Sequence, residues 1–122
     1  MVCDKKYIIR LDTVDSTNRY LRDEADVLWN ECAAEKRFVV VVAGHQTAGR
    51  GQRGNVWCSN AGDNLLFSIL LRPGEQLEVS GQFLLSQVVA LSLHDTMRCY
   101  GIDTKLKWPN DIYVENRKLA GI

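Results

Sequence analysis

Phe38-Val39-Val40-Val41-Val42-Ala43 is the most apolar segment around which this 122-residue chain is organised. Six consecutive apolar residues with four valines among them are typical of a strand that is buried on both faces. The residues that follow, Gly44 to Gly54, contain four glycines and two arginines and predict a loop. Glycines let the backbone approach a ligand closely and present successive N–H groups to it. The sequence therefore predicts a buried strand that leads into a candidate binding loop.

Further strands are predicted on both sides of this stretch. They cover residues 7–11, 64–71, 105–108, 112–114 and 118–122. The last two read as a hairpin whose turn is Glu115 to Arg117, where Asn116 tolerates positive φ.

Two helices are predicted between the strands. The first runs from about Thr17 to Trp29 after the N-cap types Asp15 and Ser16. The second covers residues 80–100, with Ser80 as its cap and Gly101 as its C′ glycine. Its apolar residues occupy adjoining faces, so we expect this helix to be largely buried. Alternating helices and strands indicate an α+β class in which a mixed sheet packs against helices.

The composition is that of a single globular domain over residues 1–122, with 46% hydrophobic and 25% charged residues. Fifteen basic and fifteen acidic residues argue against nonspecific nucleic-acid binding. No apolar run approaches the roughly 20 residues of a membrane-spanning helix. The first ten residues lack a secretory apolar core, which favours a cytoplasmic location without a membrane partner. The four scattered cysteines show no metal or redox spacing.

Within the glycine-rich loop, Arg50 and Arg53 offer forked donors suited to carboxylate or phosphate. An ordinary surface loop with two solvated arginines is the alternative, and composition alone favours it. The loop lacks the G-K-[ST] of a Walker A motif.

Three further segments could carry chemistry. Asn110 and Asp111, in Lys107 to Asp111, have oxygens that could hold Mg²⁺, although a turn with a buried tryptophan explains the segment equally well. Lys118 begins an apolar strand, where a lysine needs an anionic partner unless it lies exposed at the hairpin mouth. Asp15 to Asn18 could bind a polar ring, although a plain helix cap explains them as well.

Four segments occur in the order found in the biotin–protein ligase family. They are D-S-T-N at 15–18, Q-T-A-G-R-G at 46–51, K-W-P-N-D at 107–111 and R-K-L-A-G-I at 117–122. The chain resembles this family from Tyr7 onward, and Trp57 falls where the family has a tryptophan. The resemblance implies the N-terminal part of a class II synthetase-like catalytic domain, a fold shared with lipoate ligases. It also implies that a C-terminal portion is missing and that no DNA-binding winged helix precedes Tyr7.

The implied activity is that of a ligase. Biotin is activated with ATP and Mg²⁺ to biotinyl-5'-AMP and transferred to a lysine of a biotin carboxyl carrier protein. A lipoate-type ligase and a non-catalytic biotin- or nucleotide-binding fragment stay open as alternatives, and a homodimer is compatible with the sequence.

The resemblance also implies roles for individual residues. The biotin-binding set is Ser16, Thr17, Asn18, Gln46, Arg50, Gly51, Gln52 and Lys118. The ATP-binding set is Arg50, Arg53, Trp57, Lys107, Asn110 and Asp111, and the last two would also lie near Mg²⁺. Arg50 and Lys118 would be catalytic, and we expect them to converge on one anion-holding cavity. Gln52 stands where the family often has arginine, which removes a cation next to the adenylate.

Overall fold

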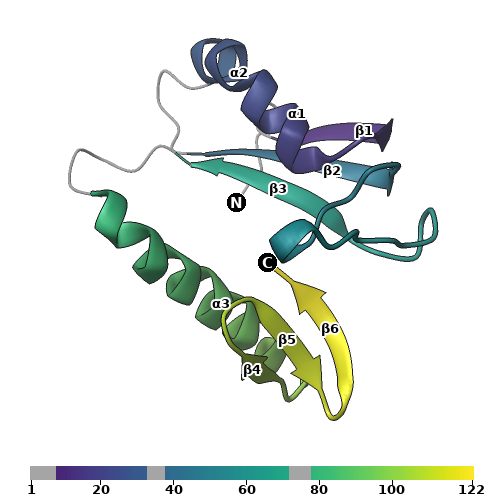
Figure 1. Cartoon of the computed structure of the whole chain (residues 1–122), viewed down its shortest axis with the longest axis vertical. Helices are drawn as coiled ribbons and strands as arrows, with labels where there is room; N and C mark the ends of the chain where they lie inside the picture. Colours follow the sequence, from purple (N-terminus) through teal and green to yellow (C-terminus); the bar gives the residue numbers. More distant parts are fainter. Residues whose placement is uncertain (1–7, 33–37, 72–77) are drawn as a thin grey trace. The chain divides into compact units, whose positions relative to one another are not determined.

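The structure, a computed structural model, describes residues 8–32, 38–71 and 78–122. Residues in contact group the chain into two units, Met1–Pro73 and Gly74–Ile122. They are called unit 1 and unit 2 below, and each is described by itself. The elements of both are labelled in Figure 1. The prediction of one domain over residues 1–122 stays a prediction.

The apolar stretch forms the middle strand of the sheet in unit 1. Strand β2 (Phe38–Gln46) lies between β1 (Ile8–Val14), which runs parallel to it, and β3 (Leu66–Leu71), which runs antiparallel. Both edges of β2 are therefore hydrogen-bonded. The sheet is mixed, as the sequence predicts.

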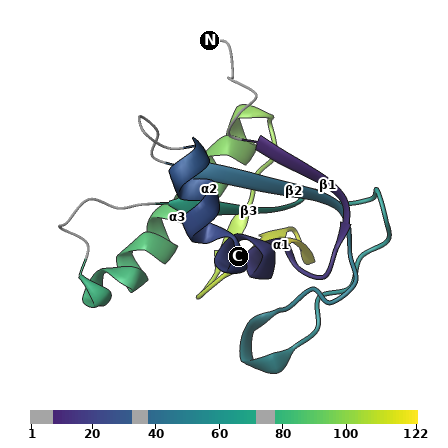
Figure 2. The same ribbon diagram turned by 90° about the horizontal axis from the view of Figure 1, so that it is seen from above.

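Helices α1 (Thr17–Asp23) and α2 (Ala25–Cys32) lie over one face of this sheet, as Figures 1 and 2 show. The core between helices and sheet is made by Leu21, Leu28, Val39 and Val41. Val39 and Val41 alternate along β2 with side chains that point to the other face, because successive residues of a strand face opposite ways. The packing of two helices on a mixed sheet confirms the predicted α+β class.

The prediction that β2 is buried on both faces is correct for only one of them. Val39 and Val41 are fully buried, whereas Phe38 is 48% exposed. Val40 and Val42, on the same side as Phe38, are partly buried. The reason is that α1 and α2 both pack on the Val39 side. A continuous run of valines gives no sign of which face a helix covers.

The predicted helix from Thr17 to Trp29 is two helices. The break falls at Glu24, which ends α1 with φ −100° and ψ 5°. Asp23, Glu24 and Asp26 surround it. Acidic side chains are unfavourable in the last turn of a helix and favourable in the first. This run therefore disfavours one continuous helix and favours a new start at Ala25.

Unit 2 consists of a helix and a small antiparallel sheet. The sheet has the order β4 (Lys105–Lys107), β5 (Asp111–Val114) and β6 (Arg117–Gly121), and α3 (Gln82–Cys99) contacts β4 and β5. Ile112 of β5 and Ala90 of α3 are buried. None of the described helices is long and apolar enough to cross a membrane.

Helix α3 starts later than predicted and is less buried. Its N-cap is Gly81, because a 3-10 turn, η3 (Val79–Gly81), occupies the position where Ser80 was expected to cap. Gly101 follows the helix at φ 74°, as predicted for a C′ glycine. Leu84, Val88 and Leu91 are at least half exposed. Eighteen helical residues extend about 27 Å, and strands of three to five residues are too short to cover that length.

The hairpin between β5 and β6 turns over two residues. Val114 pairs with Arg117, so the turn consists of Glu115 and Asn116. The positive φ, 52°, falls on Glu115, although Asn116 is the turn residue that tolerates such an angle better. A two-residue hairpin turn needs a left-handed residue at its first central position, and this requirement outweighs the general preference for asparagine.

We expect Val41→Ala to lower the free energy of unfolding by about 2 kcal/mol, because it removes methyl groups from a fully buried site between sheet and helices. Urea denaturation followed by circular dichroism measures this change. Val27→Ala, at a 51% exposed position of α2, is the matched control and should leave stability nearly unchanged. Equal losses in the two variants would show that β2 is not central to the core.

Candidate functional site

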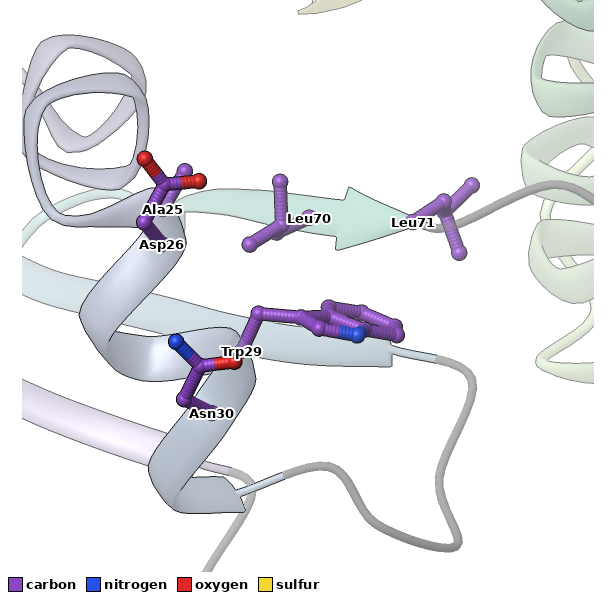
Figure 3. A pocket seen from close by; sticks show the side chains of 6 residues that line it. All are labelled: Ala25, Asp26, Trp29, Asn30, Leu70 and Leu71. Atoms are coloured by element: carbon purple, nitrogen blue, oxygen red, sulfur yellow. The ribbon is translucent and has the colours of Figure 1, made fainter.

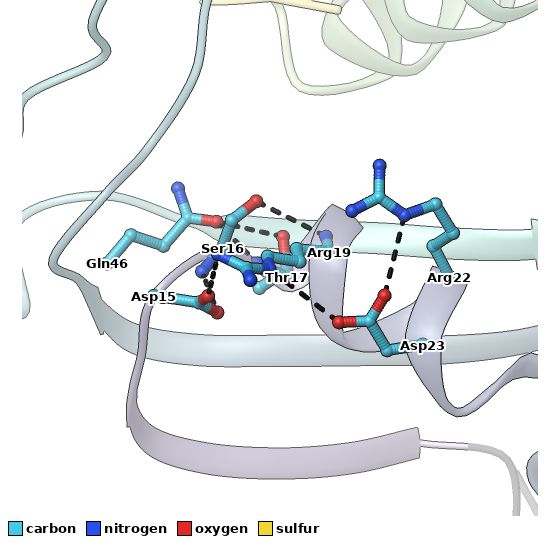
Figure 4. A network of polar contacts seen from close by, with 7 residues as sticks. All are labelled: Asp15, Ser16, Thr17, Arg19, Arg22, Asp23 and Gln46. Atoms are coloured by element: carbon cyan, nitrogen blue, oxygen red, sulfur yellow. Dashed lines mark hydrogen bonds and ion pairs between the residues drawn. The ribbon is translucent and has the colours of Figure 1, made fainter.

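The start of α1 is tied to the end of β2 by one glutamine. The backbone N–H of Thr17 donates to Gln46 Oε1 at 2.8 Å, and Thr17 Oγ1 donates to the same oxygen at 3.0 Å. Figure 4 shows these bonds beside the helix. Because a backbone N–H requires an acceptor, the carbonyl oxygen of Gln46 must face Thr17. Its amide nitrogen, with two N–H donors, therefore points elsewhere.

A residue that the sequence did not single out completes this cluster. Ser68 Oγ of β3 lies 2.8 Å from Thr17 Oγ1. Since the Thr17 hydroxyl proton is directed to Gln46, the Ser68 hydroxyl donates to Thr17. Thr17 is only 3% exposed, so its polar atoms need these partners. The Thr17–Gln46–Ser68 cluster joins α1, β2 and β3.

The D-S-T-N segment also caps the helix, as the alternative interpretation proposed. Ser16 is the N-cap of α1 with extended backbone, and its Oγ accepts from the N–H of Arg19 at 3.4 Å. Asp15 accepts from the N–H of Ser16 at 2.7 Å and pairs with Arg19. Asn18 is exposed and stands outside these bonds. The cap uses one of the two acceptor positions of the Ser16 hydroxyl oxygen.

The glycine-rich loop is a closed hairpin. Arg50 and Val56 form an antiparallel bridge, and the N–H of Gly51 donates to the carbonyl of Asn55 at 2.7 Å. One residue farther from the tip on each arm, the N–H of Trp57 donates to the carbonyl of Gly49 at 2.9 Å. The 3-10 turn η2 (Gln52–Gly54) forms the tip. The loop that composition predicts therefore has a defined backbone path.

Gly49 is required at the base of this hairpin. A Cβ atom there would lie 2.6 Å from the carbonyl oxygen of Trp57 and 3.1 Å from Gln46 Nε2. The first distance is too short for any side chain, because the obstacle is backbone. The second shows that the Gln46 amide nitrogen lies beside the hairpin base, so the Thr17–Gln46–Ser68 cluster and the hairpin are neighbours.

The hairpin presents its two arginines at the surface. Arg50 and Arg53 are both exposed, and Arg53 lies at the tip with φ 56°. Gln52 is exposed beside it. Within the described part of the chain the Arg50 guanidinium forms no hydrogen bond or ion pair. Its donors are therefore available to an anion.

The lysine predicted to need an anion has one within the chain. Lys118 Nζ lies 2.7 Å from Asp111 Oδ1, and this carboxylate oxygen is shielded from solvent. The ammonium compensates the charge of the shielded carboxylate, and the carboxylate fixes the position of the ammonium. The two residues stand on adjacent strands of the hairpin, β5 and β6.

Asn110 closes the same hairpin. Its side-chain Nδ2 donates to the carbonyl of Ile122 at 3.2 Å, and its own carbonyl accepts from the N–H of Ile122 at 2.9 Å. The oxygen atoms left to coordinate Mg²⁺ are Asn110 Oδ1 and the second carboxylate oxygen of Asp111. Among the described residues no group of three or more His, Cys, Asp or Glu could hold a metal. This donor set fits Mg²⁺ only where phosphate oxygens and water complete its shell.

The aromatic residue of K-W-P-N-D is not buried, contrary to that alternative. Trp108 is 51% exposed, and its ring centroid lies 6.2 Å from that of Phe83 on α3. Lys107 Nζ lies 5.7 Å from the centroid of the Tyr113 ring, within the range of a cation–π contact.

A shallow pocket lies at the other end of unit 1 and takes no part in these clusters. Figure 3 shows its lining, which is Ala25, Asp26, Trp29, Asn30, Leu70 and Leu71. Leu71 pairs with Phe38, the first residue of β2, whereas Gln46 is the last. The pocket and the Thr17–Gln46–Ser68 cluster are therefore separated by the length of β2.

The predicted site residues thus fall into two groups. Ser16, Thr17, Gln46 and Arg50 belong to unit 1, with the hairpin beside Gln46. Lys107, Asn110, Asp111 and Lys118 belong to unit 2. The convergence of Arg50 with Lys118 stays a prediction.

Residues 11–122 match the sequence model of the biotin/lipoate A/B protein ligase family. The bifunctional ligase/repressor BirA of Escherichia coli (strain K12) is 38% identical over 115 residues, which cover 92% of this chain and 32% of that protein. The biotin–[acetyl-CoA-carboxylase] ligase of Mycobacterium tuberculosis is 36% identical over 118 residues, which cover 93% of this chain and 43% of that protein. The chain therefore spans less than half the length of these relatives.

Solved structures of the same kind resemble the chain. The biotin protein ligase of Leishmania major in complex with biotin has a TM-score of 0.75 at 26% identity, and the match covers 94% of this chain and 49% of that one. The biotin acetyl coenzyme A carboxylase synthetase of Helicobacter pylori has a TM-score of 0.70 at 29% identity, covering 93% and 52%. With the family match over residues 11–122, these likenesses show that the chain belongs to the biotin/lipoate A/B protein ligase family.

Proposed function

We propose that this chain carries the biotin- and ATP-binding residues of a biotin–protein ligase, which forms biotinyl-5'-AMP and transfers biotin to a lysine of a biotin carboxyl carrier protein. The observation that carries the proposal is the Thr17–Gln46–Ser68 cluster beside the glycine hairpin. It brings together two of the four family segments, D-S-T-N and Q-T-A-G-R-G. Relatives named biotin ligases favour biotin over lipoate as the substrate.

The cluster offers what the biotin ring system requires. The ring is a cyclic urea with one carbonyl acceptor and two N–H donors. The Gln46 amide nitrogen, turned away from Thr17, is a donor for the carbonyl. Hydroxyl oxygens of Ser16 and Thr17 are acceptors for the N–H groups, and exposed Asn18 can serve as either. Rigid internal bonds hold these groups in place before the ligand arrives, which lowers the entropic cost of binding.

Adenylation brings two anions together. A biotin carboxylate oxygen forms a bond to the α-phosphorus of ATP, the bond from that phosphorus to the bridging oxygen breaks, and pyrophosphate leaves with the electron pair. Catalysis of such a step is mostly positioning and neutralisation of charge. Arg50 and Lys118 are the cations that we propose for it. No general base is needed, because the carboxylate is already ionised at neutral pH.

The Lys118–Asp111 pair suits this purpose. The Asp111 carboxylate holds the ammonium in place, and we propose that this ammonium contacts the biotin carboxylate and the α-phosphate when they are bound. Mg²⁺, bound through phosphate oxygens near Asn110 and Asp111, would supply further neutralising charge when present. Arg53, Trp57 and Lys107 complete the proposed ATP-binding set.

The second half-reaction is attack by the neutral amine of the carrier lysine on the mixed anhydride, which releases AMP. The hairpin around Arg50, Gly51 and Gln52 would cover the adenylate and exclude water, which would otherwise hydrolyse it. The carrier protein, a homodimer and a cytoplasmic location stay predictions.

Incubation of the chain with biotin, ATP and MgCl₂ is expected to yield biotinyl-5'-AMP, detected by mass spectrometry. Lipoate in place of biotin is the control and should yield far less adenylate. Preferential formation of lipoyl-AMP would identify a lipoate-type ligase. Binding of biotin without any adenylate would indicate a non-catalytic module.

We expect Lys118→Ala to reduce adenylate formation by on the order of a hundredfold, because a donor to the transition state is lost. Biotin-dependent exchange of labelled pyrophosphate into ATP measures the rate. The variant leaves Asp111 without its cation, so its free energy of unfolding is measured as well, to separate the loss of the donor from the strain of a shielded charge. Wild-type exchange in the variant would remove Lys118 from the catalytic set.

We expect Arg50→Ala to slow adenylate formation at least tenfold, since its guanidinium neutralises developing charge. Single-turnover formation of biotinyl-5'-AMP is the readout. Arg22→Ala is the matched control, because Arg22 is an exposed arginine of α1 paired only with Asp23 among the described residues. An unchanged rate in Arg50→Ala would remove Arg50 from the proposed catalytic set.

A further inference from the structure

One face of the sheet in unit 2 carries a row of lysines. Lys105 pairs with Tyr113 across β4 and β5, and Tyr113 pairs with Lys118 across β5 and β6. Directly paired residues of antiparallel strands project to the same face. Lys107 and Asp111 are each two residues from a member of this row, so they share its face. This lysine face therefore comprises Lys105, Lys107, Asp111, Tyr113 and Lys118.

The other face of the sheet packs on α3. Helix α3 contacts β4 and β5, and Ile112, which alternates with Asp111 and Tyr113, is 1% exposed. Within unit 2 the lysine face is thus the one that is not occupied by its own helix.

The lysine face has an excess of positive charge that is held in place. Lys118 Nζ is fixed 2.7 Å from Asp111 Oδ1, and Lys107 Nζ is held 5.7 Å from the centroid of the Tyr113 ring. Three ammonium groups share the face with one carboxylate. Lys105 is exposed and forms no ion pair among the described residues. The aromatic ring holds one cation near the middle of the row without neutralising it.

We infer that Lys105 is an additional anion-binding residue, and that the lysine face binds a linear polyphosphate, namely the β- and γ-phosphates of ATP and the pyrophosphate that leaves. The inference rests on the proposed function, which places the α-phosphate at Lys118. Neighbouring strands are about 4.8 Å apart, so the backbones of Lys118 and Lys105 lie roughly 10 Å apart across three strands. A triphosphate that begins at Lys118 extends along the row towards Lys105.

The lysine face would favour cleavage of the bond between the α-phosphorus and the bridging oxygen, because it stabilises the pyrophosphate that leaves. When the bond between the α-phosphorus and the bridging oxygen is cleaved, the electron pair and the additional negative charge stay on pyrophosphate. Ammonium groups along the β- and γ-phosphates stabilise that charge as it forms. Lys105, the member farthest from Lys118, then affects ATP and pyrophosphate but not biotin.

Binding of inorganic pyrophosphate to the chain, measured by isothermal titration calorimetry without biotin, tests the inference. We expect Lys105→Ala to weaken binding about threefold to tenfold, as for one exposed charged contact, and to make it less sensitive to salt. Lys105→Arg should retain most of the affinity. Arg117→Ala is the matched control, because Arg117 pairs with Val114 and belongs to the opposite face of the same hairpin.

Wild-type affinity for pyrophosphate in Lys105→Ala would overturn the inference, as would equal losses in Lys105→Ala and Arg117→Ala, or no binding by the wild-type chain. The adenylation assay keeps this outcome separate from the proposed function. If the chain forms biotinyl-5'-AMP with an unchanged KM for ATP in Lys105→Ala, only the role of Lys105 fails. If pyrophosphate binding depends on Lys105 but no biotinyl-5'-AMP forms, the polyphosphate face stands and the ligase activity fails.

Discussion

The parallel pairing of β1 with β2 fixes the geometry of unit 1. Two parallel strands in register end at the same edge of their sheet, and here Val14 pairs with Gln46 at that edge. Helix α1 begins three residues after Val14, so its first turn must lie beside the last residue of β2. The contact between Thr17 and Gln46 follows from this register. Ser68, brought alongside by β3, then satisfies the remaining hydrogen bond of a buried hydroxyl.

Charge is positioned in two different ways in the two units. In unit 1, Arg50 is carried by a hairpin whose closure requires a residue without a side chain at position 49. The backbone is fixed, while the long side chain is left to the solvent. In unit 2, the strand fixes only the backbone of Lys118, and the Asp111 carboxylate holds the ammonium itself. The mobile guanidinium of Arg50 can adjust its position after a ligand binds. The ammonium of Lys118 is already positioned before a ligand binds.

The sequence predicted the elements whose signals are local. The valine run, the second helix and its C′ glycine at Gly101 are confirmed, because hydrophobic period and backbone preference act over a few residues. The family segments brought Thr17 and Gln46 into the candidate site. Ser68 was missed because a serine within an apolar strand acquires its role only from a partner 51 residues away. The Lys118–Asp111 pair depends in the same way on the register of two strands, which residue types alone do not specify. The uneven burial of β2 and α3 reflects which faces other elements cover, and amphipathic patterns do not encode that coverage.

The three tryptophans of the chain can serve as local fluorescent probes. Trp57 closes the base of the glycine hairpin through its backbone and is partly buried there, while Trp29 stands on α2 and Trp108 beside Phe83 in unit 2. The chain's three indoles therefore sample three separate environments. Phenylalanine at two of these positions leaves a single tryptophan, and the wavelength of its emission reports the hydration of that one site. With Trp57 as the remaining tryptophan, stopped-flow emission reports changes at the hairpin base without an attached dye.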